Sequence, residues 1–413
     1  MAVPTNILEQ VITYQESSLA LLINQNPWIA TANKKFNNFD QFAGNLGSTV
    51  SFDLPPRFVT NQTLVATFQG SEQRVQNLTV DQAENVSYAF DAQQFIFNVD
   101  EYMDRFGKSA IAELGSSIGS NIAENAVSHT YRAFNAPAIG STTIAPINSY
   151  QQYAQALANF RNYGAPNSMA KVYVDDVSIP AVVGSGLQEF ALDRNNEIAN
   201  SWMLGKFSNA EFMSSNLLPV HTAGTIGNNG TVLTVSAIDP TGTQVTFTGA
   251  GAGETLVEGD ILTFATPAPA SNSLFFLHFV GHKTSGQQVQ VRVTADAVEG
   301  GGSITATVFP ALIDTAGVAN QNINQALVGN EAGALPDHRA GLICSGDPLF
   351  LAMPRLPEEV PFPTANVIDP DSGASMRMYY GSVFGQNERG FVNDCIWGST
   401  LVDEYAMRVV YPL

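Results

Sequence analysis

An abrupt change of pattern after Leu217-Leu218-Pro219 constrains the fold of this chain more than any other feature. From there to about Ile313 the sequence is rich in Gly, Thr and Val, and short stretches such as Thr231-Val232-Leu233-Thr234-Val235 alternate apolar with polar residues. Short alternating stretches separated by glycine-rich turns are typical of the strands of a small barrel or sandwich. A mixed helix and strand pattern resumes beyond Ile313. We therefore predict an all-β barrel over residues 220–313, inserted in a host domain that it splits.

The longest helical signal lies before this insertion, at residues 100–134. Apolar residues such as Ile111 and Ile118 recur there at spacings of three and four, which predicts a helix of about 50 Å at a rise of ~1.5 Å per residue. Asp100 suits its N-cap. Three glycines lie inside the segment: Gly107, Gly115 and Gly119. Each weakens a helix by about 1 kcal/mol relative to Ala, so we expect a bend.

The remaining chain mixes short helices and strands. Residues 7–23 predict a helix that ends at Asn26-Pro27, and residues 50–54 and 64–68 predict the strands of an extended hairpin loop. Further expected elements are a helix at 149–162, strands at 170–174 and 340–344, a helix starting near Pro348, and closing strands at 376–380 and 406–411. The pattern therefore predicts an α+β fold.

The charge balance limits what the chain can bind. Charged residues make up 13% of the 413 residues, about half the usual share, and the net charge is −19. A polyphosphate would be repelled, whereas a weakly charged polar surface suits burial against further copies of the chain. No basic segment precedes an apolar run at the N-terminus, and no stretch of about eighteen apolar residues occurs, so we expect cytosolic synthesis and no membrane partner.

The motifs that could carry chemistry have simpler structural interpretations. The run Gly249 to Gly253 precedes a strand instead of a helix, which predicts a barrel turn and not a dinucleotide site. His278 and His282 would share the face of a strand but have no third zinc ligand nearby. Asp175-Asp176 fits a loop and helix cap, and the run 369–373 fits a turn better than a calcium loop. We expect no enzyme activity, catalytic residue, cofactor or metal.

The order of these elements resembles the major capsid proteins of tailed phages, which have the Hong Kong 97-type fold, and within them the podovirus coat-protein family with its inserted domain. The closest local matches are the runs 207–219 (FSNAEFMSSNLLP) and 257–262 (VEGDIL), and the closing runs 376–380 and 404–410. The resemblance covers nearly the whole chain as ordered patterns and not as invariant motifs.

The resemblance implies a division of the chain into named parts. These are an N-terminal arm (1–48), an extended hairpin loop (49–85), a peripheral domain with the spine helix (86–148), an axial core domain (149–219 and 314–374), the inserted β-barrel domain (220–313), and C-terminal strands that return to the peripheral domain (375–413). The long helix is the expected site of deformation when a precursor shell expands.

The resemblance also implies a function and partners. Copies of the chain would form pentamers and hexamers of an icosahedral shell in the virion, assembled in the host bacterial cytoplasm around double-stranded DNA without binding it specifically. A separate scaffolding protein, a portal protein and a decoration or cement protein would be its partners. An isopeptide crosslink from the loop is not expected, because no Lys occurs between Phe36 and Gly107. The candidates for intersubunit contacts are Phe58, Phe68, Arg57, Arg74 and Trp28.

Two other functions are compatible with the sequence. The barrel could recognise a host glycan or receptor while the rest of the chain displays it, although Phe275, Phe276 and Phe279 outline no evident aromatic groove. A tail or tube protein is a third possibility, which the single long helix and the split core disfavour.

Overall fold

The computed structural model describes the chain in segments that fall into two compact units. The described residues are 19, 22, 26–33, 49–60, 64, 68, 70, 73–91, 107–184, 206–267, 272–357, 364–368, 374–382 and 388–413. Unit 1 comprises Met1–Phe52, Val75–Ala126 and Leu349–Leu401, and unit 2 comprises Asp53–Arg74, Val127–Pro348 and Val402–Leu413. Each unit is described by itself below.

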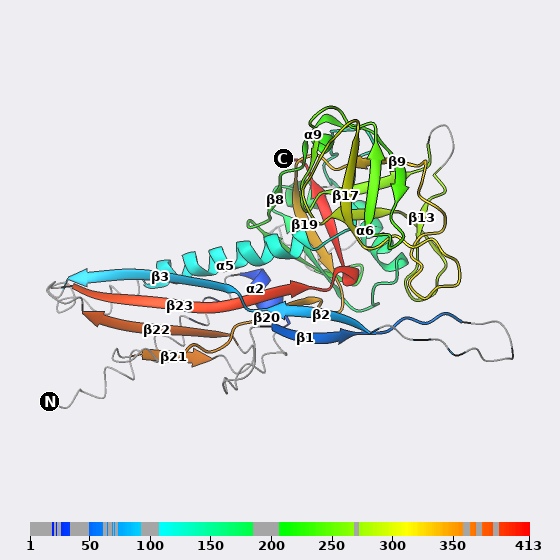
Figure 1. Cartoon of the computed structure of the whole chain (residues 1–413). Helices are drawn as coiled ribbons and strands as arrows, with labels where there is room; N and C mark the ends of the chain where they lie inside the picture. Colours follow the sequence, from blue (N-terminus) through cyan, green and yellow to red (C-terminus); the bar gives the residue numbers. More distant parts are fainter. Residues whose placement is uncertain are drawn as a thin grey trace. The chain divides into compact units, whose positions relative to one another are not determined.

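A five-stranded sheet forms the centre of unit 1. Its order is β20 (Leu349–Ala352), β23 (Glu388–Leu401), β22 (Ser375–Ser382) and β21 (Thr364–Ile368), with β3 (Gln82–Asp91) paired antiparallel to β23. Helix α5 (Lys108–Ser128) lies along this sheet (Figure 1). The Asn125 amide donates to the Ser399 carbonyl at 2.9 Å, and the Asn121 amide donates to Glu84 at 2.6 Å. These bonds fix one side of the helix to β23 and β3.

A different side of α5 contacts the N-terminal segment, at Leu22 and Asn26. Asn26 caps α2 (Pro27–Thr31), whose first residue is a proline, and its amide also bonds the Gly115 carbonyl of α5. Proline is favoured in the first turn of a helix, so Asn26-Pro27 begins a helix here, whereas the sequence predicted only that it would end one. The predicted helix at 7–23 lies outside the described residues, except that Leu19 and Leu22 are helical and buried.

The long helix is shorter than predicted at its C-terminal end. It ends at Ser128, and Ala133–Phe134 form strand β4 instead of the last helical turn. The hydroxyl and the N–H of Thr130 both donate to the Val127 carbonyl, at 2.6 and 3.0 Å, which closes the helix there. Asp100 lies outside the described residues. Gly115 and Gly119 lie within one uninterrupted helix, where their lack of a side chain lets Leu22 and Asn26 approach the helix closely.

The predicted hairpin loop has one described pair of strands at its base. Strands β1 (Thr49–Leu54) and β2 (Arg74–Thr79) pair with each other, which confirms the strand predicted at residues 50–54. The strand predicted at residues 64–68 lies outside the described residues, apart from Leu64 and Phe68.

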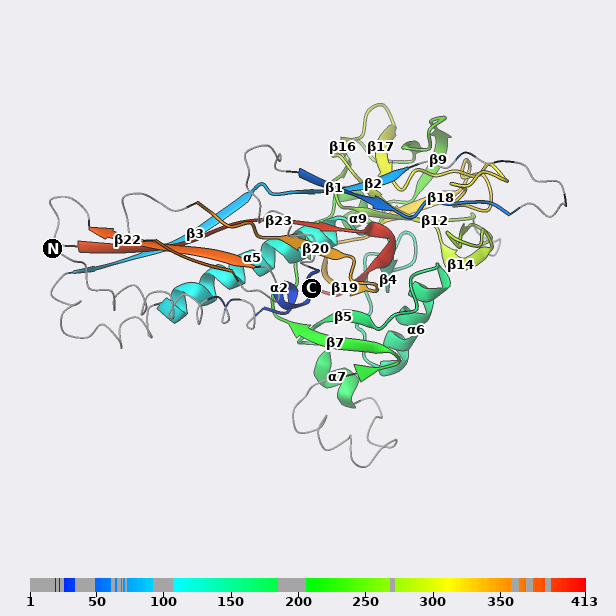
Figure 2. The same ribbon diagram turned by 90° about the horizontal axis from the view of Figure 1, so that it is seen from below.

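A seven-stranded sheet and a closed barrel build most of unit 2. The sheet runs β4, β24 (Ala406–Tyr411), β19 (His338–Cys344), β5 (Ala170–Asp175), β7 (Ala210–Ser215) and β6 (Lys206–Phe207), with β8 (Val220–His221) on β19. Figure 2 shows β5 and β7 side by side with α6 (Tyr150–Asn162) next to them. A capping box between Ser149 and Gln152 starts α6. Tyr153 of α6 packs edge-on against Phe212, which fastens the helix to the sheet.

The barrel closes with six antiparallel strands. They are β10 (Gln244–Thr248), β17 (Ser303–Phe309), β15 (Gln290–Val293), β12 (Ile261–Ala265), β18 (Glu331–Ala334) and β9 (Leu233–Ile238), around an interior that includes Phe247, Phe264, Val291 and Ile304. Inward residues alternate with outward ones, as in the buried and exposed positions of β17. The sixth strand, β18, lies beyond residue 313, so the barrel extends to Ala334.

Shorter elements complete unit 2. They are α7 (Ile179–Gly184), α9 (Thr225–Asn229), β11 (Thr255–Leu256), β13 (Phe275–Leu277), β14 (Thr284–Gln288), β16 (Ala297–Val298) and the 3₁₀ turn η4 (Asp403–Tyr405). The glycine-rich run at 249–253 is a turn between β10 and β11, as predicted.

Three further points of the sequence analysis differ from the structure. The helix expected near Pro348 is strand β20, which the ladder to β23 holds in place from Leu349 onward. The fourteen-residue strand β23 was not predicted at all, because Asn393, Asp394 and Gly398 interrupt its apolar alternation. His278 and His282 lie in a turn with a positive φ of 49° at His282, and not on one face of a strand.

Candidate functional site: the loop base and the barrel junction

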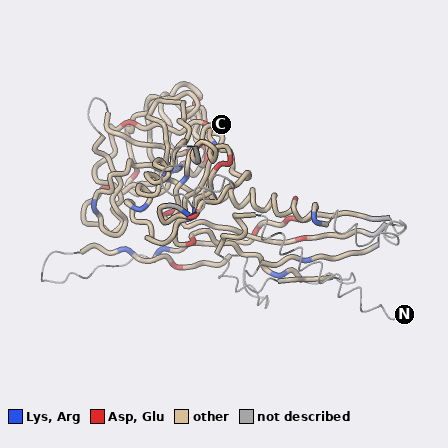
Figure 3. The backbone as a smooth tube through the Cα atoms, turned by 180° about the vertical axis from the view of Figure 1, so that it is seen from behind, with Lys and Arg blue, Asp and Glu red and all other residues tan. Residues whose placement is uncertain are grey.

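The base of the predicted hairpin loop is held by one carboxylate. Arg57 and Arg74, on the two sides of the loop, both bond Glu404 in η4, and the Arg74 Nη1 to Glu404 Oε2 distance is 3.2 Å. The three side chains expose 16%, 25% and 12% of their surface. Charged residues are sparse along the described chain (Figure 3), so this concentration is a distinctive feature of unit 2. We call these three residues the loop base.

Aromatic rings and a further arginine surround the loop base. Arg132 donates to the backbone carbonyls of Glu404 at 3.0 Å and Ala406 at 3.1 Å, and its guanidinium lies 4.1 Å from the centre of the Tyr163 ring. The Arg57 guanidinium lies 5.7 Å from the Phe279 ring centre. Cation–π contacts and backbone bonds stabilise buried guanidinium groups without a carboxylate. The turn that carries Glu404 is therefore fixed through both its backbone and its side chain.

Asp403 is the second acidic residue of the η4 turn, and its buried carboxylate has few polar partners. Its Oδ2 lies 3.6 Å from Arg292 Nη2, and its Oδ1 has no hydrogen-bond partner in the described part of the chain. Burial raises the pKa of Asp403 from 3.8 to about 7, and the neighbouring Glu404 adds to the rise while Arg292 opposes it. The turn therefore holds a carboxyl group that titrates near neutral pH.

We expect Asp403→Asn to flatten the pH dependence of stability. The unfolded chain releases the Asp403 proton near its ordinary pKa of 3.8, whereas the folded chain keeps it until about 7, so rising pH destabilises the folded state across this window. Relative to wild type, the variant should gain about 3 kcal/mol of stability as the pH rises from 4.5 to 8, at ~1.36 kcal/mol per pKa unit, because the folded pKa already includes the attraction to Arg292. Urea unfolding at both pH values measures this.

Asp314→Asn is the matched control, because Asp314 is exposed. It should leave the difference in unfolding free energy between the two pH values unchanged. An Asp403→Asn variant that shows the same pH dependence as wild type would contradict the role given to this carboxyl group.

The predicted contact residues have different environments. Phe58 and Phe68 expose 56% and 98% of their surface and remain candidates for contacts with other copies. Trp28 is fully buried, so its ring offers no surface to a neighbour and it is withdrawn from the candidates. Arg57 and Arg74 pair with Glu404 of the same chain, so at least part of each guanidinium group is engaged within the chain.

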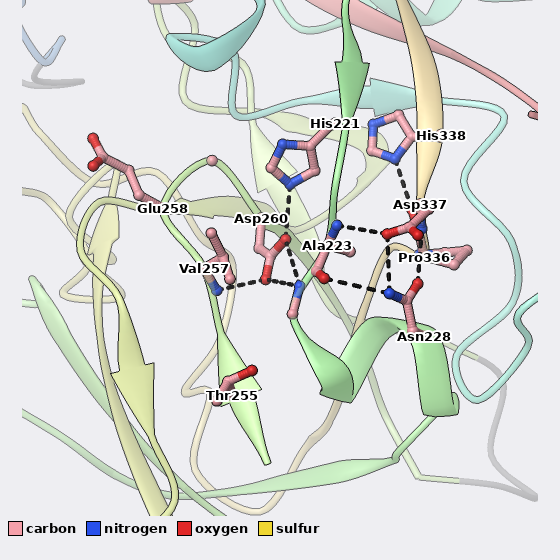
Figure 4. Close-up of polar contacts among 12 residues, drawn as sticks. His221, Ala223, Asn228, Thr255, Val257, Glu258, Asp260, Pro336, Asp337 and His338 are labelled. Atoms are coloured by element: carbon pink, nitrogen blue, oxygen red, sulfur yellow. Dashed lines mark hydrogen bonds and ion pairs between the residues drawn. The ribbon is translucent and has the colours of Figure 1, made fainter.

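The chain enters the barrel and leaves it at one junction, shown in Figure 4. On the entering side His221 is the last residue of β8, and its Nε2 donates to Asp260 Oδ1 at 2.8 Å. Asp260 is 1% exposed and also accepts from the backbone N–H groups of Gly224, at 3.1 Å, and Val257, at 2.8 Å. This carboxylate therefore ties the incoming chain to the turn before β12. The sequence marked this turn only as a local match.

The leaving side of the junction has its own carboxylate. Asp337 accepts from the Ala223 N–H at 2.7 Å and from the Asn228 amide at 2.9 Å, and its own N–H donates to Asn228 at 3.0 Å (Figure 4). A Cβ at Gly224 would overlap the Thr255 carbonyl, and one at Gly227 would overlap the Leu335 carbonyl. The entering segment therefore passes β11 at Gly224 and the leaving segment at Gly227 too closely for any residue other than glycine at these two positions.

A buried arginine and a buried histidine lie beneath the junction. His338 Nδ1 donates to the Pro336 carbonyl at 2.7 Å, so its Nε2 accepts from Arg408 Nη1 at 3.2 Å. Arg408 also donates to Thr130 Oγ1 and to the carbonyls of Val127 and Gly259. Burial and the Arg408 charge lower the pKa of His338 from 6.5 to about 3, so this site loses stability as the pH falls from 6.5 toward 3.

Among the described residues, neither the junction nor the loop base gathers a set of metal-ligating side chains. In the described segments no three His, Cys, Asp or Glu side chains gather as a metal site would require. Asp175 at the end of β5 is paired with Arg339 at 3.0 Å, and the run 369–373 lies outside the described residues. The helices that the structure describes include none with the length and hydropathy needed to cross a membrane.

Comparison with known proteins finds structural similarity only. No family model matches this sequence, and no curated protein matches it. A structure from Mycobacterium phage Che8 matches with 9% identity and a TM-score of 0.47, over 93% of this chain and 91% of that chain.

Two further structures are described as phage capsids. The capsid structure of Cyanophage P-SCSP1u has 10% identity and a TM-score of 0.39, over 88% of this chain and 84% of that chain. The acid-stable capsid structure of Helicobacter pylori bacteriophage KHP30 has 10% identity and a TM-score of 0.39, over 94% of this chain and 92% of that chain. Similarities at this level assign neither a family nor a function to this chain.

Proposed function

We propose that this chain is the major capsid protein of a tailed double-stranded DNA bacteriophage, with a Hong Kong 97-type fold and an inserted barrel. The order of the described elements carries the proposal. After α2 comes a strand pair at the loop base, followed by β3 and the long helix α5. Next comes a sheet whose chain is interrupted between β8 and β19 by a closed barrel, and the closing strands come last. This is the order that the family resemblance of the sequence implies.

The proposed work of the chain is assembly. Copies would form pentamers and hexamers of a shell that encloses DNA, with a separate scaffolding protein and a portal as partners and a decoration protein as a further candidate. A net charge of −19 suits a shell that contains DNA without binding it. Phe58 and Phe68 are the proposed apolar contacts, because large exposed apolar side chains on one segment mark interaction surfaces.

The aromatic residues of the barrel region give little support to the alternative function, in which the barrel binds a glycan or receptor. Phe276 is fully buried and packs edge-on against Tyr131 and Tyr163, so its ring is part of the interior of unit 2. Phe279 lies against Tyr163 and Tyr405 in the same interior. The Phe276 ring therefore offers no surface to a sugar, and the Phe279 ring is partly buried against its neighbours.

Electron microscopy tests the proposal directly. The chain, expressed alone and with the candidate scaffolding protein from the same genome, should give closed shells or rings of five and six copies in negative stain. The double variant Phe58→Ser/Phe68→Ser should reduce the yield of shells at least tenfold, because each serine removes an apolar contact worth about 1.5–3 kcal/mol when fully buried. Its circular dichroism should remain that of wild type, since both side chains are exposed.

Val177→Ser is the control, because Val177 is 74% exposed and lies outside the loop. It should assemble as wild type does. A stable monomer under both expression conditions would overturn the capsid proposal. Normal shells from the double variant would reject only the contact role of the two phenylalanines.

A further inference from the structure

A buried asparagine joins the N-terminal segment to the middle of α5. Asn26 is 2% exposed, and its Nδ2 donates to the Gly115 carbonyl at 2.9 Å across 89 residues of sequence. Its Oδ1 accepts from the Trp28 N–H at 3.0 Å, so the same side chain also caps α2. One amide therefore holds two helices of unit 1 together.

The helix surface under this amide is made of glycine. Gly115 and Gly119 are four residues apart and so lie on one face of α5. A Cβ at Gly119 would overlap the Asn26 amide, and a Cβ at Gly115 would come within 3.2 Å of Leu22 Cδ1. The docked segment therefore requires the absence of a side chain at Gly119, and at Gly115 it leaves room for a Cβ only if Leu22 shifts slightly.

The same two glycines make this part of α5 intrinsically weak. Glycine is a poor helix former because it loses more backbone entropy than other residues. In a helix the Gly115 carbonyl faces the N–H of Gly119, and the Asn26 amide is a second donor to that carbonyl. The helix cannot bend toward the Asn26 amide, because the amide already contacts Gly119. If the helix bent away, the hydrogen bond from Asn26 to the Gly115 carbonyl would break. The sheet side is held separately, through Asn121 and Asn125.

We propose that the Asn26 amide is a latch on α5. While it is bound, it keeps the helical hydrogen bonds intact around Gly115 and Gly119, and when the N-terminal segment leaves α5 these hydrogen bonds can break and the helix can bend there. The latch is a property of the single chain. It does not depend on shell formation, although in a shell it would make the position of the N-terminal segment control the shape of the helix.

Asn26→Ser separates the latch from the helix cap. Serine retains an acceptor for the Trp28 N–H, because Ser and Asn are similarly good N-caps, but it cannot reach the Gly115 carbonyl with a donor. Hydrogen exchange of the unassembled full chain, followed by mass spectrometry, should show about five- to tenfold faster exchange over residues 115–123, as expected for the loss of one hydrogen bond. Exchange in β22 and β23 should be unchanged.

Two further variants test the geometry. Gly119→Ala should also accelerate exchange at 115–123 although alanine favours helix, because its methyl group displaces the amide, and Asn26→Ala/Gly119→Ala should return exchange to the wild-type rate or slower. Ser120→Ala, at an exposed position on α5, is the control and should not accelerate exchange. Unchanged exchange in Asn26→Ser, or acceleration spread over the whole of unit 1, would overturn the latch whether or not the chain forms shells.

Discussion

Gly398→Ala should lower the free energy of unfolding by about 3 kcal/mol, the upper end of the usual cost of overpacking, because the atoms that the new methyl group meets cannot move aside. Gly398 lies in β23, where a Cβ would overlap the Thr79 carbonyl and come within 2.8 Å of Val80 Cα. All of these neighbours are backbone atoms, so relief requires one chain segment to move. The loss should appear in urea unfolding as a lower midpoint.

The same strand supplies the control for this prediction. Gly390 also lies in β23, but a Cβ there would meet nothing within 4 Å. Gly390→Ala should therefore leave stability unchanged or raise it by up to about 1 kcal/mol, because alanine loses less backbone entropy than glycine on folding. If the two variants were equally stable, close backbone approach would not explain Gly398.

Local signals allowed the sequence to predict several elements. The apolar spacing of residues 149–162 identifies α6, and strict alternation identifies strands such as β9 and β17. Glycine-rich turns between strands locate the barrel. These features depend on neighbours within a few residues, so no tertiary knowledge is needed.

The elements that were missed depend on partners far along the chain. Strand β23 contains Asn393, Asp394 and Gly398, and forms because β3, β22 and β20 pair with it. Strand β20 was wrongly predicted as a helix because its pairing partner, β23, also lies far along the chain. The predicted barrel ended early because β18 is short, EAGA, and has no alternating pattern of its own.

The loop base could be anticipated only in part. The sequence identified Arg57 and Arg74 as functional candidates, but Glu404 lies 347 and 330 residues away from them, and no local pattern links such distant residues. Arg408 had a visible signal, since it is a charged residue inside the apolar strand AMRVVY and is fully buried. Such a residue indicates a buried polar network, although not its members.

Glu404→Gln should lower the free energy of unfolding by about 2–3 kcal/mol. Breaking one partner of a fully buried ion pair costs about 3–5 kcal/mol, and the partial exposure of Arg57 and Arg74 reduces that figure through solvent screening. Glutamine keeps the shape of the side chain but leaves both guanidinium groups without a charged partner. Residues 53–60 should also lose protection from hydrogen exchange, because Glu404 anchors both sides of the loop.

Glu211→Gln is the matched control for this change. Glu211 pairs with Lys206 at 3.7 Å, and their side chains expose 37% and 60% of their surface, so the loss should be below about 0.5 kcal/mol. Arg74→Gln in the Glu404→Gln background should cost less than Arg74→Gln alone, because the carboxylate is already absent. Equal costs in the two backgrounds would mean that Arg74 and Glu404 are neighbours without coupling. The loop would then be held mainly by the packing of Arg57 against Phe279.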